Sequence, residues 1–209
     1  MELSEAIRRR RMIRAYDPDR PVPDEAVDAL LHNAIRAPSA GFSQGWDFLV
    51  LRTPADRERF WSVTREPGEP DAWLTGMQTA PVLIVCLSDK NTYLDRYAES
   101  DKGWTDRSES RWPVPYWDVD TGMAAMLMLV TAVDHGLGSC FFGVPPDLFD
   151  PFRAAFDIPA DRGPVGVVAL GYAAADRPSP SLKRGRRGLD QVAHEGRFGT
   201  AYRTGTRHA

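Results

Sequence analysis

The chain has 209 residues, of which 43% are hydrophobic and 26% are charged, and its formal net charge is -3 at pH 7. This composition is typical of a single globular domain that is long enough to bury a substantial core. The slightly negative charge argues against a nucleic-acid-binding protein, because such proteins need a basic surface to displace counterions from phosphate groups.

The N-terminal residues are predicted to form a short helix that Ser4 caps and that ends before Pro18. The stretch RRRRMIRAY, residues 8–16, straddles the end of this helix, where cations are favoured. A second basic stretch, without any acid, occupies residues 177–187. Two such clusters can converge on a single dianionic group, because arginine offers a planar fork of donors that matches phosphate oxygens.

An amphipathic helix is predicted from Asp24, its N-cap, to the residue before Pro38. The loop SAGFSQG, residues 39–45, follows and leads into the strand WDFLVLR, residues 46–52. Its letters GFSQG match the nucleophile elbow G-x-S-x-G of hydrolases. That elbow needs a strand before the serine and a helix after it, and here the order is reversed, which argues against hydrolase chemistry.

A third helix is predicted in TPADRERFWSV, residues 53–63, with Thr53 as its cap and proline at its first position. Residues 65–77 are predicted to form a loop, and APVLIVCLSD, residues 80–89, a strand that is buried on both faces. From residue 90 to 117 no clean period is present and tryptophans accumulate. This segment is predicted to be an irregular lid or binding loop, with plain core and interface packing as an equal alternative.

The segment TGMAAMLMLVTAVDH, residues 121–135, is predicted to be a helix that is apolar almost all round and therefore buried in the core or between two subunits. A helix over 147–156 and a core strand in GPVGVVALGYA, residues 163–173, follow. The stretch from Asp176 has no buried pattern and is predicted to be an arm that lies on another surface. Strands alternate with helices, which indicates one α/β or α+β domain.

The two cysteines, Cys86 and Cys140, lie in apolar stretches and are expected to be reduced, buried thiols. The four histidines are far apart without paired spacing, so no metal site is expected. Neither a P-loop nor a complete G-x-G-x-x-G is present. No apolar run reaches the roughly 18–20 residues that span a bilayer, so we expect a cytoplasmic protein without a membrane partner.

Several motifs together resemble the FMN-dependent nitroreductase family. Residues 10–16, RRMIRAY, are similar to that family's R-R-S-x-R-x-F opening, and APSAGFSQGWDF, residues 37–48, to its A-P-S-x-x-N-x-Q-P-W-x-F segment. The resemblance continues in GLGS, residues 136–139, and in ALGYAAADRP and GLDQVAH near the C-terminus. It implies an α+β fold with a central, mostly antiparallel sheet flanked by helices, in an intertwined homodimer with two FMN sites at its interface.

The resemblance also implies which residues hold FMN. Contacts to the phosphate, ribityl chain and pyrimidine edge are expected from residues 10–14, and contacts to the flavin of the partner subunit from residues 38–40. Residues 141–143 are expected to lie along the ring, where one of their backbone N–H groups can meet N5, and the C-terminal arm is expected to complete the phosphate site. With two further residues, 42 and 44, the expected cofactor-binding set is Arg10, Arg11, Met12, Arg14, Pro38, Ser39, Ala40, Phe42, Gln44, Phe141, Phe142, Gly143, Lys183, Arg184 and Arg186. Met12 replaces the family's serine, Phe42 its asparagine and Gly45 its proline.

The implied activity is hydride transfer from NAD(P)H to flavin N5 and then, in a ping-pong cycle, to an electron-poor acceptor such as a nitroaromatic compound or a quinone. The flavin carries this chemistry, so no catalytic side chain is expected. Two alternatives stay open: a flavin-dependent dehydrogenase or oxidase that tailors a small metabolite, and a flavin-binding protein without enzymatic activity.

Overall fold

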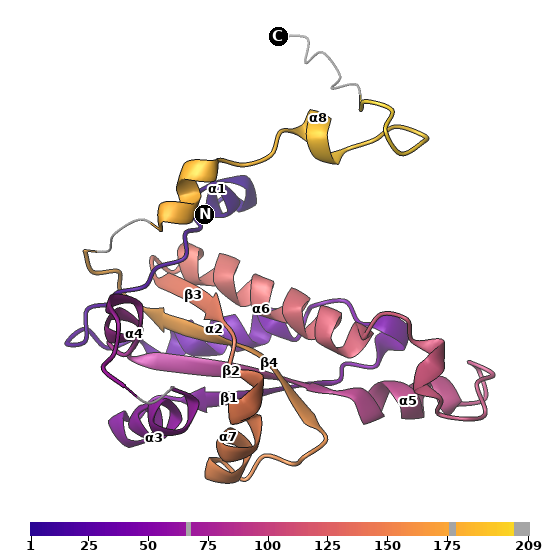
Figure 1. Cartoon of the computed structure of the whole chain (residues 1–209), viewed down its shortest axis with the longest axis horizontal. Helices are drawn as coiled ribbons and strands as arrows, with labels where there is room; N and C mark the ends of the chain where they lie inside the picture. Colours follow the sequence, from indigo (N-terminus) through magenta and orange to yellow (C-terminus); the bar gives the residue numbers. More distant parts are fainter. Residues whose placement is uncertain (66–67, 176–178, 203–209) are drawn as a thin grey trace. The chain divides into compact units, whose positions relative to one another are not determined.

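The structure is a computed structural model that describes residues 1–65, 68–175 and 179–202. The chain divides into two units, residues 1–176 and residues 177–209. The first unit contains the sheet and all but one of the labelled helices in Figure 1.

The sheet of the first unit has four strands in the order β1-β2-β4-β3, and every neighbouring pair is antiparallel. The strands are β1 (Trp46–Leu51), β2 (Val82–Asp89), β3 (Gly138–Phe142) and β4 (Arg162–Gly171). Every residue of β2 is buried, as its near-continuous apolar run predicts for a central strand. The predicted α+β architecture with an antiparallel sheet is therefore confirmed.

Helices cover both faces of this sheet (Figure 1). Their bounds are α1 Leu3–Arg9, α2 Asp24–Ala34, α3 Pro54–Thr64, α4 Ala72–Met77, α5 Lys90–Ala98, α6 Tyr116–Asp134 and α7 Phe149–Ala155, with single 3-10 turns at Ala40–Phe42, Glu109–Arg111 and Pro146–Leu148.

The strands divide their side chains between two cores because successive residues of a strand point to opposite faces. Val82, Ile84 and Cys86 of β2 pack with α2 and α6. Leu83 and Val85 pack on the other face with α3, α4 and α7. The long apolar helix α6 therefore lies in the first core, one of the two places that its composition allowed.

Both cysteines are buried and free, as predicted. Burial raises the pKa of the Cys86 thiol to about 12. This thiol therefore stays protonated at neutral pH and is a packing group rather than a nucleophile.

The helix starts were predicted with mixed success. Thr53 caps α3, since its hydroxyl accepts the backbone N–H of Asp56 at 3.1 Å. Ser4 does not cap α1, which begins one residue earlier without a side-chain cap. Asp24 is the first residue of α2 rather than its N-cap, and its carboxylate instead pairs with Arg52.

Two segments predicted to be irregular contain helices. Asp71 accepts the N–H of Leu74 at 2.7 Å and starts α4 inside the predicted loop 65–77. Asp89, the last residue of β2, accepts the N–H of Asn91 at 2.9 Å and starts α5. The predictions were wrong here because a carboxylate cap can begin a helix too short or too polar to show a hydrophobic period.

The second unit consists of a 3-10 turn, Pro180–Arg184, the short helix α8, Leu189–Val192, and an isolated bridge between His194 and Ala201. From Pro180 to Val192 every residue is exposed. Residue 176, where the arm was predicted to begin, lies outside the described residues, and the role of the arm against a partner subunit stays a prediction.

The Thr53 cap offers a direct test of the helix start. We expect Thr53→Ala to lower the free energy of unfolding by about 1 kcal/mol, because the N–H of Asp56 loses its acceptor. Ser4→Ala is the matched control, and it should change that free energy by less than about 0.5 kcal/mol. Urea denaturation measures both; equal losses would contradict the cap.

Candidate functional site

The predicted site segment 10–14 is fixed along the edge of the sheet. After α1 ends, the chain runs extended: Met12 forms a parallel bridge with Ser139, and the N–H of Ile13 donates to the Ser139 carbonyl at 2.9 Å. Farther along, the buried Tyr16 donates its hydroxyl to the carbonyl of Ile13 at 2.7 Å. These bonds bring the segment to β3, the strand that carries the predicted residues 141 and 142.

Two buried polar atoms at this edge have no hydrogen-bond partner among the described residues. They are Nη1 of Arg10 and Oγ of Ser139. Ser139 bridges Met12, two residues from Arg10, so both atoms belong to the same segment pair. A buried donor without an acceptor costs free energy, so these two atoms are candidates for contact with acceptor atoms of a ligand or of an ordered water molecule. Ser139 occurs in a quoted motif but was not predicted as a site residue.

Arg14 is held by contacts on both sides. Its Nη1 donates to the Met12 carbonyl at 3.1 Å, and its own carbonyl lies against α4, where a β-carbon added at Gly76 would overlap it. Met12 is half-buried between the two cores, and its sulfur lies 3.5 Å from the N–H of Phe141. The methionine that replaces the family's serine is thus a packing residue that ties segment 10–14 to β3.

Arg11 is directed differently from Arg10 and Arg14. Its Nη1 donates to the carbonyls of Arg8 and Arg10 at 2.6 and 3.0 Å, at the end of α1. It also lines a separate cavity of about 170 Å³ together with Arg9 and the turn after α6. The Arg11 guanidinium is therefore engaged with the backbone at the end of α1, and its part in the site stays a prediction.

The predicted site residues between positions 38 and 44, which we call loop 38–44, are anchored by a buried carboxylate. Asp120 of α6, 1% exposed, accepts the N–H of Ala40 at 2.8 Å and the hydroxyl of Tyr93 at 2.7 Å. Within the loop, Ser39 Oγ accepts the N–H of Gln44 at 3.0 Å. Asp120 was not predicted as a site residue, since a single acid in an apolar helix carries no spacing signal.

This loop has an unusual backbone. Gly41, Phe42 and Gln44 have φ values of 63°, 57° and 55°, a region that non-glycine residues rarely adopt. Arg96 also donates to the Gly41 carbonyl at 3.0 Å, so the surroundings hold the strained conformation. Phe42 is 76% exposed, and Pro38 is exposed as well.

The predicted residues 141–143 separate at the end of β3. Phe141 packs in the α2–α6 core, and Phe142 points to the opposite face, where its ring stacks on Trp61 at 5.6 Å between centroids. Gly143 is exposed, and a β-carbon added there would meet nothing. Its backbone is thus open to a ligand.

A cavity of about 370 Å³ adjoins this strand end. Phe142 and Gly143 line it together with Trp61 of α3 and Trp73 of α4. Neither tryptophan was predicted to belong to the site, and Trp73 could not be, because α4 itself was not predicted. We call this space the β3 cavity.

Segment 10–14 and loop 38–44 lie at opposite ends of the sheet in one chain. Loop 38–44 is tied to Asp120, near the start of α6, whereas Met12 pairs with Ser139 after the end of α6. Figure 1 shows α6 running between the end near α5 and the end near β3. With a rise of 1.5 Å per residue, the distance from Asp120 to the end of α6 at Asp134 is about 21 Å. One small ligand cannot contact both sets in the same chain.

The aromatic segment is a packed cluster rather than a free lid. The ring centroid of Trp112 lies 4.6 Å from that of Tyr97 and 5.4 Å from that of Trp104. Loop 38–44 rests on it, since a β-carbon at Gly41 would press on the Tyr97 ring. The equal alternative of core packing fits this arrangement, and a wall over the ligand stays a prediction.

Lys183, Arg184 and Arg186 are exposed residues of the second unit, and their part in the site stays a prediction. Among the described residues, no group of three or more His, Cys, Asp and Glu side chains is placed to hold a metal ion. No helix in the described ranges combines the length and apolarity needed to cross a bilayer.

Comparisons with known proteins identify the family. Residues 7–172 match the nitroreductase family. A Methanothermobacter thermautotrophicus protein with the provisional name NADH dehydrogenase/NAD(P)H nitroreductase is 32% identical over 83% of this chain and 78% of its own. An NADH dehydrogenase of Thermus thermophilus is 29% identical over 84% of this chain and 89% of its own.

Solved structures agree with the fold. An Exiguobacterium sibiricum protein, provisionally named a nitroreductase and solved in complex with FMN, superimposes with a TM-score of 0.70 at 22% identity over 93% of this chain and 97% of its own. The chain belongs to the nitroreductase family.

The close approach of α4 to Arg14 predicts that Gly76 cannot be replaced. Gly76→Ala should lower the free energy of unfolding by about 1–3 kcal/mol, because the added methyl group overlaps the Arg14 carbonyl. Thr75→Ala, at the exposed neighbouring position, is the control and should change it by less than about 0.5 kcal/mol. A Gly76→Ala protein as stable as the control would contradict this packing.

The buried pair of Tyr93 and Asp120 predicts a dependence of stability on high pH. Burial and the hydrogen bond to Asp120 raise the pKa of Tyr93. Above about pH 10 the unfolded chain releases this proton while the folded chain keeps it, so the free energy of unfolding falls as pH rises. Tyr93→Phe removes this contribution.

Urea denaturation between pH 8 and 11 tests the prediction. The variant should be less stable at pH 8, because Asp120 loses a donor, and its stability should fall less steeply above pH 10. Parallel curves for the two proteins would show that Tyr93 does not titrate differently on folding.

Proposed function

We propose that this chain is an FMN-dependent oxidoreductase that takes hydride from NAD(P)H and delivers it to an electron-poor small molecule. The observation that carries the proposal is that two buried polar atoms, Nη1 of Arg10 and Oγ of Ser139, have no hydrogen-bond partner among the described residues, in two segments that the Met12–Ser139 bridge joins. An FMN phosphate would supply acceptor oxygens to both donors and a negative charge to the guanidinium. Membership of the nitroreductase family and the FMN complex of a structural neighbour support this ligand.

Each part of the edge segment has a role in this proposal. Arg10 and Ser139 donate to the phosphate, and Lys183, Arg184 and Arg186 of the C-terminal arm add positive charge around it. Arg14, fixed by its contact with Met12, presents a permanent cation to the pyrimidine edge of the flavin and so favours the reduced, more negative form. Met12 holds the segment against β3 and leaves the phosphate to its neighbours.

Flavin, when bound, supplies hydride acceptance and donation at N5. The chain's contribution is the open backbone of Gly143, which has no side chain and no heavy atom within 4 Å of where a β-carbon would stand, so that its N–H can donate to N5. Phe141 and Phe142 fix that backbone by packing into opposite cores. No acid–base side chain is required, because donor and acceptor exchange hydride with the same ring face in turn, in a ping-pong cycle.

A homodimer would complete the site. Residues 10–14 lie too far from Pro38, Ser39, Ala40, Phe42 and Gln44 of the same chain to share one flavin, so the second set is proposed to act on the flavin of the partner subunit. The exposed Leu3 and Ile7 of α1 and Met126 of α6 offer an apolar surface for that contact. The strained loop, which presents Phe42 outward, is suited to reach across it.

The purified protein tests the proposal. It should be a yellow dimer with about one FMN per chain that bleaches with NADH or NADPH and recovers with a nitroaromatic compound or a quinone. Arg10→Gln should weaken FMN binding by about 1.5–3 kcal/mol, because a charge-assisted hydrogen bond to the phosphate is lost. Arg8→Gln, on the exposed side of α1, is the matched control and should bind FMN like the parent.

Fluorescence titration of the apoproteins measures the FMN affinity of both variants. Equal affinities would contradict the assignment of Arg10 to the phosphate site. A colourless protein that does not take up FMN would overturn the proposal. If the protein is yellow but neither NADH nor NADPH bleaches it, it binds flavin and the proposed NAD(P)H oxidoreductase activity is wrong.

A further inference from the structure

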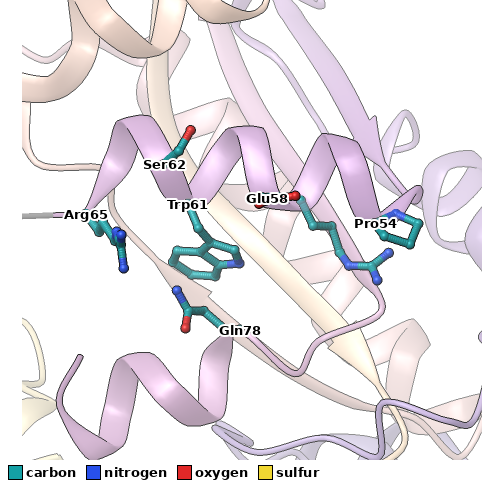
Figure 2. A pocket seen from close by; sticks show the side chains of 7 residues that line it. Pro54, Glu58, Trp61, Ser62, Arg65 and Gln78 are labelled. Atoms are coloured by element: carbon teal, nitrogen blue, oxygen red, sulfur yellow. The ribbon is translucent and has the colours of Figure 1, made fainter. Parts of the chain in front are cut away.

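The face of α3 that turns towards α4 lines a second cavity of about 390 Å³, which we call the α3–α4 cavity. Two rows of residues spaced four apart line it from the side of α3, and one residue comes from the end of α4. The first row is Pro54, Glu58 and Ser62, the second is Arg57, Trp61 and Arg65, and the residue from α4 is Gln78. Residues four apart lie on the same side of a helix, so this face is built as a continuous surface. In Figure 2 the Gln78 side chain reaches from the end of α4 towards the Trp61 indole.

Trp61 carries an unexplained polar group in this cavity. The residue is 6% exposed, and its Nε1 is buried without a hydrogen-bond partner in the described part of the chain. A buried indole N–H usually finds an acceptor, because leaving it unpaired costs free energy. The packing of Trp61 is accounted for by its stack on Phe142, but its N–H is not. An acceptor atom of a ligand in the cavity would satisfy it.

The cavity also gathers positive charge. Arg57 is fixed by donating to the carbonyls of Arg52 and Pro81, and burial lowers the pKa of its guanidinium. Arg65, the residue that follows α3, lies eight residues farther along the chain, about 12 Å away along the helix axis. Glu58 is the acid among the lining residues, so the cations outnumber it. A ligand with anionic groups at some distance from an uncharged ring suits this spacing.

The uncharged part of such a ligand is indicated by Trp61 and Gln78. The indole N–H is a pure donor, and the carboxamide of Gln78 offers both an acceptor and donors. Adenine carries ring nitrogens that accept and an amino group that donates, and glutamine pairs with its edge in two hydrogen bonds. An adenosine phosphate therefore meets the donors, the amide and the arginines of the cavity together.

The α3–α4 cavity adjoins the β3 cavity. Trp61 and Arg65 line both, and the Trp61 ring stacks on Phe142 with an interplanar angle of 8°. Phe142 precedes Gly143, whose N–H is proposed to meet flavin N5. An elongated molecule with a redox-active ring at one end and an adenosine phosphate at the other could thus extend from one cavity to the other past the edge of Trp61.

We propose that the α3–α4 cavity binds the adenosine phosphate half of the NAD(P)H donor, with Trp61 and Gln78 on the adenine and Arg57 and Arg65 on the phosphates. This rests on the proposed oxidoreductase function. The excess of cations favours the additional 2′-phosphate, so NADPH is the preferred donor. The cavity thereby sets the donor specificity of the enzyme without touching the reacting atoms.

Binding of the isolated half tests the cavity without any turnover. Adenosine 2′,5′-bisphosphate is titrated into the FMN-loaded protein in a calorimeter. Arg65→Gln should weaken its binding about tenfold, because a charge-assisted contact is lost. Trp61→Phe keeps an aromatic ring against Phe142 but removes the N–H, and it should weaken binding several-fold.

Arg59→Gln is the matched control. Arg59 lies on the same helix but faces α7, with its guanidinium 5.7 Å from the Phe156 ring centroid, and it does not line the cavity. It carries the same loss of charge and should leave the affinity unchanged. Absence of binding to the parent at millimolar concentration, or equal affinity of all three variants, would overturn the proposal.

A shortened hydride donor shows whether the adenosine phosphate bound in the cavity is part of NAD(P)H or a free adenine nucleotide. Reduced nicotinamide mononucleotide lacks the adenosine half, so Arg65→Gln should raise the KM for NADPH about tenfold and leave the KM for the short donor unchanged. If Arg65→Gln changes the KM for both donors equally while the parent still binds the free bisphosphate, the assignment to NAD(P)H is overturned and the cavity is a site for a free adenine nucleotide. Failure of both donors to bleach the flavin would overturn the proposed function, while the calorimetry would still decide whether the cavity exists as a nucleotide site.

Discussion

The burial of β2 on both faces is the constraint on which the rest of the molecule depends. Because this strand can form no surface of its own, α2 and α6 must cover one side of the sheet and α3, α4 and α7 the other. Both ends of the sheet then carry a site segment: residues 10–14 beside the start of β3, and loop 38–44 before β1. The two segments are far apart because the strands and α6 are long. A site shared between two copies of the chain is the simplest way to bring both segments to one ligand.

Much of the fold could be predicted from the sequence, because strands and long helices have a recognisable hydrophobic period. The apolar runs at 46–52 and 80–89 and the helix capped by Thr53 were predicted with nearly the correct bounds. The short helix α4 could not be, since six residues with a glycine and a threonine show no period and only Asp71 marks the start. With α4 missing, the contributions of Gly76 and Trp73 to the site could not be predicted either.

The candidate site was predicted unevenly for a related reason. Arg10, Arg14 and loop 38–44 belong to motifs, so resemblance alone places them near a cofactor. The residues that hold these motifs in position act through single contacts at long sequence separation, such as Asp120 on the N–H of Ala40, 80 residues away. Such contacts leave no local pattern in the sequence. Arg11 also stands in the motif, but here its guanidinium donates to the backbone at the end of α1, so its place in the site stays a prediction.

Buried polar atoms without partners are the most informative groups in this structure, provided that their surroundings are considered. Trp112 Nε1 is one of them in the described part of the chain, but it lies among the rings of Tyr93, Tyr97 and Trp104, whose electron-rich faces are weak acceptors for an N–H. No ligand is required there. Nη1 of Arg10 belongs to a charged guanidinium, whose fork of donors matches the oxygens of a carboxylate or a phosphate. Trp61, whose Nε1 has no acceptor in the described part of the chain, lines an open cavity together with two arginines, which is why we assign one anionic ligand to that cavity.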